Sequence, residues 1–254
     1  MPGRGDGADA RGGVQSIARA FEVLEILAEH GPLSLSRLAA AAGLPLSTIH
    51  RLVGTLSALG YVRADAKEYS LAPRLIHLGE RSSRMLSRWA IPHLTGLVDE
   101  LGETANLAML DGDRIVYVAQ VPSRHSMRMF TEVGRRVLPH CTAVGKALLA
   151  RLPDAEVDAI VGRTGLPAHT EHTITTRAAL AAALGQIRVF GYAVDDGEQE
   201  IGVRCVAVAP TGSALPLGLS ISGPAPRMTE DLVNRAVPAL TGAASAFAAD
   251  LGGG

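Results

Sequence analysis

The sequence lacks several features that would assign the protein to one of the simpler classes. It contains only two cysteines, Cys141 and Cys205, which are too few and too far apart for a disulfide framework, so we expect reduced thiols. It has no uninterrupted apolar run of about 18 residues, and residues 1–13 lack the apolar stretch of a signal peptide. We therefore expect a cytoplasmic protein that has no membrane partner.

An excess of charge of either sign is also missing. The formal net charge of −1 provides no overall electrostatic attraction to nucleic acid. Residues 1–90 hold 11 Lys or Arg against 8 Asp or Glu, whereas the remainder is net acidic, so the N-terminal part has a mild basic bias. A length of 254 residues with 47% hydrophobic residues excludes a disordered chain and allows two domains, each with its own core.

The N-terminal residues separate into a polar arm and an amphipathic helix. Residues 1–13 are too poor in apolar side chains to form a core, so we expect a disordered arm, with or without a role for Arg4 and Arg11 at DNA. Apolar residues at helical spacing then predict a helix that begins at Ser16 and ends before His30-Gly31-Pro32.

Two more helices and a hairpin are predicted up to residue 73. Ser34 or Ser36 can cap a second helix that Gly43 terminates, and Pro45 starts a third that ends near Gly60. In the third helix, apolar residues at helical spacing are predicted to pack inward: Leu46, Ile49, Leu52, Val53, Leu56 and Leu59. Residues 61–71 are typical of two short strands around a charged turn.

This order of elements is that of a winged helix-turn-helix over residues 14–73. The polar face of its third helix has the hydroxyl and guanidinium groups that the major groove of DNA accepts. The hairpin adds basic residues that can approach phosphates. The predicted DNA-binding residues are Ser47, Thr48, His50, Arg51, Thr55, Arg63 and Lys67.

Residues 73–101 are predicted to form two helices, a linker helix over 74–88 and a helix leading into the second domain. Pro92 is expected in the first turn of the latter or at a kink. The apolar stripe of this region fits dimer contacts and packing against the second domain equally well.

From Thr104 onward, strand patterns alternate with helical ones. Residues 104–110 and 114–121 flank Asp111-Gly112-Asp113, which is a strong hairpin signal. Further strands are predicted at 126–131, 192–194, 203–209 and 217–222, and helices at 144–152, 177–189 and from Thr229. The pattern predicts an α+β domain over 89–251, with a central antiparallel sheet flanked by helices.

Several motifs in this order resemble the IclR family of bacterial transcription regulators. The resemblance covers nearly the whole chain, and its main runs are Leu44-Pro45-Leu46-Ser47-Thr48-Ile49-His50-Arg51-Leu52, Pro139-His140-Cys141-Thr142-Ala143-Val144-Gly145-Lys146-Ala147, Gly191-Tyr192-Ala193-Val194-Asp195-Asp196-Gly197-Glu198 and Leu219-Ser220-Ile221-Ser222-Gly223-Pro224. It implies a homodimer or dimer of dimers that binds pseudo-palindromic operator DNA. It also implies a GAF-like second domain that binds a small organic or aromatic acid as effector.

The resemblance implies an effector pocket formed by Thr142, Ala143, Val144, Asp195, Cys205, Ser220 and Ser222. The start of the helix near Val144 fits an anion chemically, because its backbone N–H groups are unpaired and lie at the positive end of the helix dipole. Leu107 and Met109 are expected to line an apolar wall.

Other chemistries fit the sequence less well. Gly145-Lys146 is not a phosphate loop, since His140 and Ala147 stand where that motif needs Gly and Ser or Thr. The His and Cys spacings match no standard zinc site, so we expect neither metal nor cofactor. An enzyme or small-molecule carrier that uses Cys205 and Asp195 is the alternative. We favour an effector-responsive regulator, with no catalytic residue.

Overall fold

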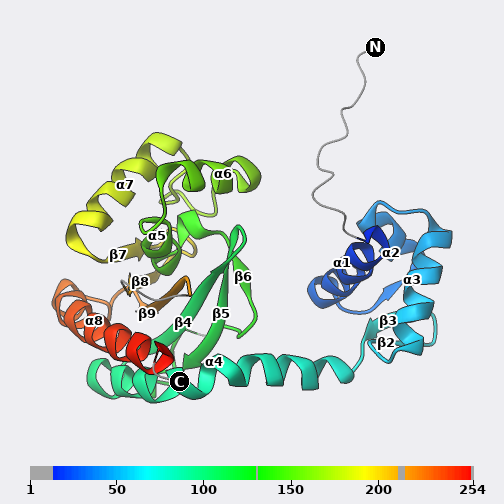
Figure 1. Cartoon of the computed structure of the whole chain (residues 1–254), viewed down its shortest axis with the longest axis horizontal. Coiled ribbons are helices and arrows are strands. Elements are labelled where there is room, and N and C mark those ends of the chain that lie inside the picture. The colour runs from blue at the N-terminus through cyan, green and yellow to red at the C-terminus, as the bar shows by residue number, and fades with distance from the viewer. Residues whose placement is uncertain (1–13, 130, 211–214, 253–254) are drawn as a thin grey trace, which may run out of the picture. The chain divides into compact units, whose positions relative to one another are not determined.

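The computed structural model describes residues 14–129, 131–210 and 215–252, apart from the side chains of 82–86. The predicted arm, with Arg4 and Arg11, lies outside the described residues. The chain divides into two compact units, Met1–Arg81 and Ser82–Gly254 (Figure 1). Among the described residues, no helix combines the length and apolar character that a membrane span requires.

The first unit contains the three helices and the hairpin that the sequence predicts. Its elements are α1 (Gln15–His30), β1 (Leu33–Ser34), α2 (Leu35–Ala42), α3 (Leu46–Ala58), β2 (Val62–Asp65) and β3 (Glu68–Leu71). The strands form an antiparallel sheet in the order β1-β3-β2, so the short piece after α1 joins the wing hairpin.

Local chemistry fixes the ends of these elements. The Ser34 hydroxyl accepts a hydrogen bond from the Arg37 backbone N–H (3.4 Å), which caps α2. Gly43 ends α2 in the left-handed region at φ 62°, a conformation that glycine adopts without strain. Leu46 and Leu59 are 53% and 51% exposed, so the prediction that they pack inward was wrong. They lie at the two ends of the buried stripe that Ile49, Val53 and Leu56 form on α3.

The second unit is built on a six-stranded antiparallel sheet in the order β6-β5-β4-β9-β8-β7, as the α+β prediction required. Its strands are β4 (Thr104–Asp111), β5 (Arg114–Val121), β6 (Arg136–Val137), β7 (Ala193–Asp196), β8 (Val203–Val208) and β9 (Leu217–Pro224). Its helices are α5 (Ala143–Leu149), α6 (Asp154–Thr164), α7 (Arg177–Phe190) and α8 (Glu230–Gly252), with a 3₁₀ turn at Pro139–Cys141. Helix α4 (Arg74–Leu101) spans the division between the units.

Helices cover both faces of this sheet (Figure 1). The C-terminal part of α4 and α8 bury Leu94, Leu240 and Phe247 in one apolar cluster that includes Leu107 of β4. On the other face, α5 buries Val144 and Leu148 against Ala207 of β8. The sheet therefore separates two cores, and α5 lies directly on β8.

Three elements differ from the sequence-based expectation. Residues 126–129 and 131 form no strand, and β6 pairs with β5 instead. Helix α6 was not predicted, although Pro153 and Asp154 open it and Val157 and Ile160 are buried three residues apart. Residues 74–101 form one helix rather than two. Pro92 lies inside it, where packing of Ala90 and Leu94 in the core compensates for the missing backbone hydrogen bond.

Candidate DNA-binding face and effector pocket

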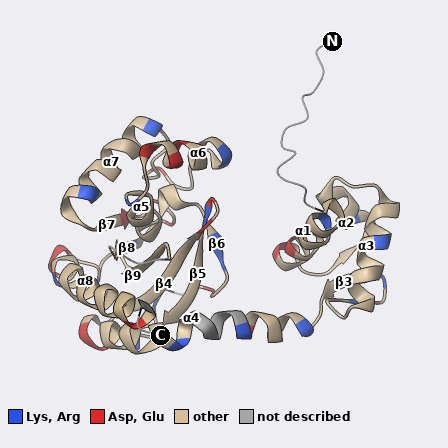
Figure 2. Ribbon diagram, viewed as in Figure 1, with Lys and Arg blue, Asp and Glu red and all other residues tan. Residues whose placement is uncertain are grey.

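Helix α3 presents a polar, basic face to solvent. Ser47, His50 and Arg51 are exposed, and Thr48 is half-buried at the edge of that face. Of the helices α1, α2 and α3, only α1 contains acidic residues (Figure 2). Gly54 lies on the same face, and a Cβ atom added there would meet nothing within 4 Å. The face is therefore open, free of carboxylates and capable of close approach to a polyanion.

The remaining predicted DNA-binding residues surround this face. Thr55 is exposed, but its hydroxyl donates to the Arg51 carbonyl (2.9 Å), so that hydroxyl is left as an acceptor. Arg63 donates from Nε to the Ser70 hydroxyl (3.0 Å), which orients its guanidinium along the hairpin. Lys67 is exposed in the turn between β2 and β3. The wing thus carries two cations, of which Arg63 is oriented by a side-chain hydrogen bond.

Backbone register brings three predicted effector residues into one row of the larger sheet. Asp195 pairs with Cys205, which in turn pairs with Ser222. Directly paired residues of neighbouring strands project from the same face, and Ser220 shares that face because it lies two residues from Ser222. Asn106 donates to the Ser222 hydroxyl (2.9 Å), which extends the polar row onto β4.

One cavity is lined by this row and by the turn that starts α5. It contains Thr142, Ala143, Val144, Asp195, Cys205, Ser220 and Ser222, all of which were predicted. Its volume is about 40 Å³, room for roughly three water molecules. Leu107 and Met109 do not line it. They alternate with Asn106 along β4, and therefore lie against the core on the opposite face.

Burial determines the protonation of the polar groups in this cavity. Removal from water raises the pKa of Asp195 to about 7, even though its Oδ1 accepts a hydrogen bond from the Glu198 N–H (2.7 Å). Burial also raises the pKa of the Cys205 thiol well above its usual value. A thiol that stays protonated is a poor nucleophile, so Cys205 forms a wall of the cavity rather than a reactive centre.

A buried ion pair links α5 to the turn after β7, beside the cavity. The Lys146 ammonium of α5 bonds to the Glu198 carboxylate in the turn after β7, and both side chains are nearly inaccessible to solvent. The Cys141 thiol donates to Gln199 Oε1 (2.9 Å) in the same turn. These contacts hold the β7–β8 turn against the start of α5.

Sequence reasoning missed eight residues that line the cavity, namely Tyr117, Met129, Thr131, Arg135, Val137, Gln199, Glu200 and Val203. Tyr117 could have been found, because it lies two residues after Ile115 on a predicted strand and therefore shares its face. Met129, Thr131 and Arg135 lie outside the helices and strands, so no helical or strand periodicity in the sequence could predict which way they face.

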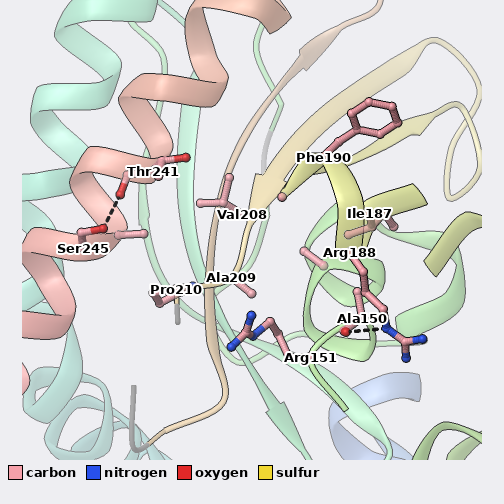
Figure 3. A pocket seen from close by; sticks show the side chains of 13 residues that line it. Ala150, Arg151, Ile187, Arg188, Phe190, Val208, Ala209, Pro210, Thr241 and Ser245 are labelled. Atoms are coloured by element: carbon pink, nitrogen blue, oxygen red, sulfur yellow. Dashed lines mark hydrogen bonds between the residues drawn. The ribbon is translucent and has the colours of Figure 1, made fainter. Parts of the chain in front are cut away.

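A larger cavity of about 360 Å³ lies at the other end of α5, between α7, α8 and the end of β8 (Figure 3). None of the predicted residues lines it. Arg188 there is held by the Ala150 carbonyl (2.9 Å) and Asp154 (2.8 Å), while Thr241 and Ser245 donate to carbonyls of their own helix. Its polar groups are thus mostly engaged, and the smaller cavity is the better candidate site.

Metal chemistry has no visible basis in the described part of the chain. Across residues 14–129, 131–210 and 215–252, no three His, Cys, Asp or Glu side chains lie close enough together to hold a metal ion. His140 and His169 approach each other with ring centroids 6.3 Å apart, but His140 Nε2 donates a hydrogen bond to the Pro167 carbonyl (3.1 Å).

Comparison with known proteins explains this combination of a DNA-binding face and a polar cavity. Residues 16–66 match the IclR helix-turn-helix domain, and residues 81–249 match the bacterial transcriptional regulator IclR C-terminal domain. The chain belongs to the IclR family. It is a DNA-binding transcription regulator, as its relatives are.

Two IclR-family relatives illustrate the similarity in sequence. The transcriptional repressor IclR of Escherichia coli (strain K12) is 37% identical over 235 residues, covering 89% of this chain and 86% of that protein. The probable transcriptional regulator SauR of Cupriavidus necator is 39% identical over 232 residues, covering 89% and 92%.

The fold agrees with solved IclR-family structures. An IclR-type regulator from Alicyclobacillus acidocaldarius superposes with a TM-score of 0.82 at 30% identity, covering 93% of this chain and 98% of that one. A regulator from Rhodococcus sp. RHA1 has a TM-score of 0.77 at 36% identity, covering 94% and 99%.

Proposed function

We propose that this IclR-family regulator binds a small organic acid in the cavity at the start of α5, and that the bound acid changes its affinity for operator DNA. The observation that supports this most directly is the convergence of seven predicted residues from α5, β7, β8 and β9 on one polar cavity. Hydroxyls and backbone N–H groups line it, and they can donate to a carboxylate.

The size of the cavity favours short acids. At about 40 Å³ it is far below the roughly 300–1,000 Å³ of sites for drug-sized ligands. An aromatic acid requires side chains such as Met129 and Val144 to move, whereas an acid of two to five carbons requires less rearrangement.

We further propose that the protein binds DNA as a homodimer or dimer of dimers. In the first unit, α1, α3 and the first turns of α4 line an apolar groove of about 450 Å³. Phe21 of α1 and Leu78 of α4 are 62% and 49% exposed in it, and a second copy would remove them from water. A symmetric dimer would bind a pseudo-palindromic operator with half-sites about 34 Å apart or a multiple of that.

The DNA-binding face can be tested by a single substitution. We expect Arg51→Ala to abolish retardation of the intergenic DNA next to the protein's own gene, and the wild-type affinity to fall steeply with salt. Arg151→Ala removes the same charge from an exposed position in the second unit, and should leave DNA binding unchanged. Equal losses in both variants would mean that only net charge matters, and would refute the assignment.

The effector site is tested by ligand-induced stabilisation. Short acids such as glyoxylate and pyruvate, together with 4-hydroxybenzoate, which a structurally similar IclR homologue from Microbacterium hydrocarbonoxydans binds, should be screened by thermal shift. An acid that binds the cavity raises the melting temperature of the wild type and much less that of Ser220→Ala. Since linkage is reciprocal, bound operator DNA must change the affinity of the protein for the acid. Equal acid affinity with and without DNA would refute the coupling.

A further inference from the structure

A cation at the mouth of the effector cavity has no assigned role. Arg135 lines the cavity and is exposed, between the chain segment that carries Met129 and Thr131 and the strand β6. Among the described residues, no side-chain hydrogen bond or ion pair engages its guanidinium. The adjacent Arg136 differs, because it bonds to the Asp111 carboxylate (2.6 Å).

The backbone fixes where Arg135 lies. The Tyr117 N–H donates to the Arg135 carbonyl (3.2 Å), and the Gly134 N–H donates to the Tyr117 carbonyl (2.7 Å). These bonds extend the pairing of β5 and β6 by one residue. Val137 lines the cavity, and Arg135, two residues before it, projects from the same face, whereas Arg136 projects from the other.

Electrostatics also places the guanidinium near the cavity. Burial raises the pKa of the Tyr117 hydroxyl, and the positive charge of Arg135 opposes that rise. Two carboxyl groups also line the cavity. They belong to Asp195, which is half protonated near pH 7, and to the exposed Glu200. Lys146, close by, is already paired with Glu198. Arg135 is thus the only cation among the residues that line the cavity.

We propose that Arg135 forms a second anion subsite, so that this cavity selects acids with two anionic groups, one held inside by the hydroxyls of Ser220 and Ser222 and the other at the mouth by the guanidinium. The inference rests on the proposed effector function and specifies its ligand class as short dicarboxylates. An arginine pairs with carboxylates through two parallel hydrogen bonds, which a monocarboxylate bound deep in the cavity cannot use.

The test compares acids of equal length on the full chain by isothermal titration calorimetry. Succinate is paired with butyrate, and glutarate with pentanoate, in the wild type, Arg135→Gln and Arg136→Gln. We expect the wild type to bind the dicarboxylate about tenfold more tightly than its monocarboxylate partner at low salt. Arg135→Gln should lose that preference and keep its monocarboxylate affinity, and Arg136→Gln should keep the preference.

The outcomes separate this inference from the proposed function. If the wild type and Arg135→Gln prefer the dicarboxylate equally, or if Arg136→Gln loses that preference as much as Arg135→Gln does, the subsite is refuted. The proposed effector site is unaffected by either result. Binding of these acids that is indifferent to Ser220→Ala, or no binding of any acid to the wild type, overturns the effector site and the subsite with it.

Discussion

Gly145 in the first turn of α5 offers a sharp test of the packing that builds the effector cavity. A Cβ atom at this position would lie 2.3 Å from the Pro139 carbonyl oxygen and 2.6 Å from the Thr142 hydroxyl oxygen. Both are far inside contact distance, and the first belongs to backbone that cannot rotate away. The Gly145→Ala variant must therefore separate the 3₁₀ turn from α5, or strain both.

The loss of stability in Gly145→Ala can be compared with the effect of the same substitution at an open position. Overpacking of this kind costs about 1–3 kcal/mol or more, and the helix propensity gained by Ala returns only about 0.5–1 kcal/mol. We expect a net loss of about 2 kcal/mol in the free energy of unfolding. Gly185, in the middle of α7, has nothing within 4 Å of its would-be Cβ, so Gly185→Ala should stabilise by about 0.5–1 kcal/mol.

The chain contains a single tryptophan, Trp89, on the part of α4 that belongs to the second unit, so urea denaturation followed by its fluorescence reports on the unit that holds the cavity. The midpoint should fall by on the order of 1 M urea in Gly145→Ala and rise in Gly185→Ala. An unchanged or higher midpoint for Gly145→Ala would show that the close approach is not rigid, and would refute the reasoning.

Three further predictions concern charge. Glu198→Gln leaves the buried Lys146 ammonium without a counter-charge and should destabilise the protein by about 3 kcal/mol in urea denaturation, whereas Lys146→Met combined with Glu198→Leu should recover much of that loss. Since the pKa of Asp195 is raised to about 7, the native state holds that proton more tightly than the unfolded state does. The stability of the wild type should therefore fall between about pH 4 and pH 7 relative to Asp195→Asn, by about 3 kcal/mol. Gly54→Glu places a carboxylate on the open face of α3 and should weaken operator binding at least tenfold in fluorescence anisotropy, while Gly54→Ala should not.

Each of these predictions has an outcome that would contradict it. A double variant no more stable than Glu198→Gln would show that the pair contributes through packing rather than charge. Parallel stability–pH curves for Asp195→Asn and the wild type would mean that Asp195 titrates normally. Equal DNA affinity in Gly54→Glu and Gly54→Ala would place the DNA elsewhere on the first unit.

Local signals predicted the first unit almost completely. The Ser34 cap, the Gly43 stop and the β2–β3 hairpin each depend on a few adjacent residues, and each occurs in the structure as the sequence indicated. The error at Leu46 and Leu59 arose because helical periodicity defines a face but does not show which positions on that face become buried.

The second unit shows where sequence reasoning ends. Asp195, Cys205 and Ser222 come together through strand register, which the family resemblance implied but residue spacing alone could not show. Leu107 and Met109 were placed on the wrong wall because a strand covered on both faces carries apolar residues on each face, so hydrophobicity does not show which face borders the cavity. Arg135 could not be found, since its position depends on hydrogen bonds to Tyr117 rather than on any repeating pattern.

The scarcity of lysine has a practical consequence. Lys67 and Lys146 are the only two lysines, and Lys146 is buried in an ion pair, whereas Lys67 is exposed at the tip of the wing. An amine-reactive dye applied to the folded protein should therefore attach, apart from the terminal amine, at Lys67 alone. Such a dye would report operator engagement directly from the hairpin, without any engineered attachment site.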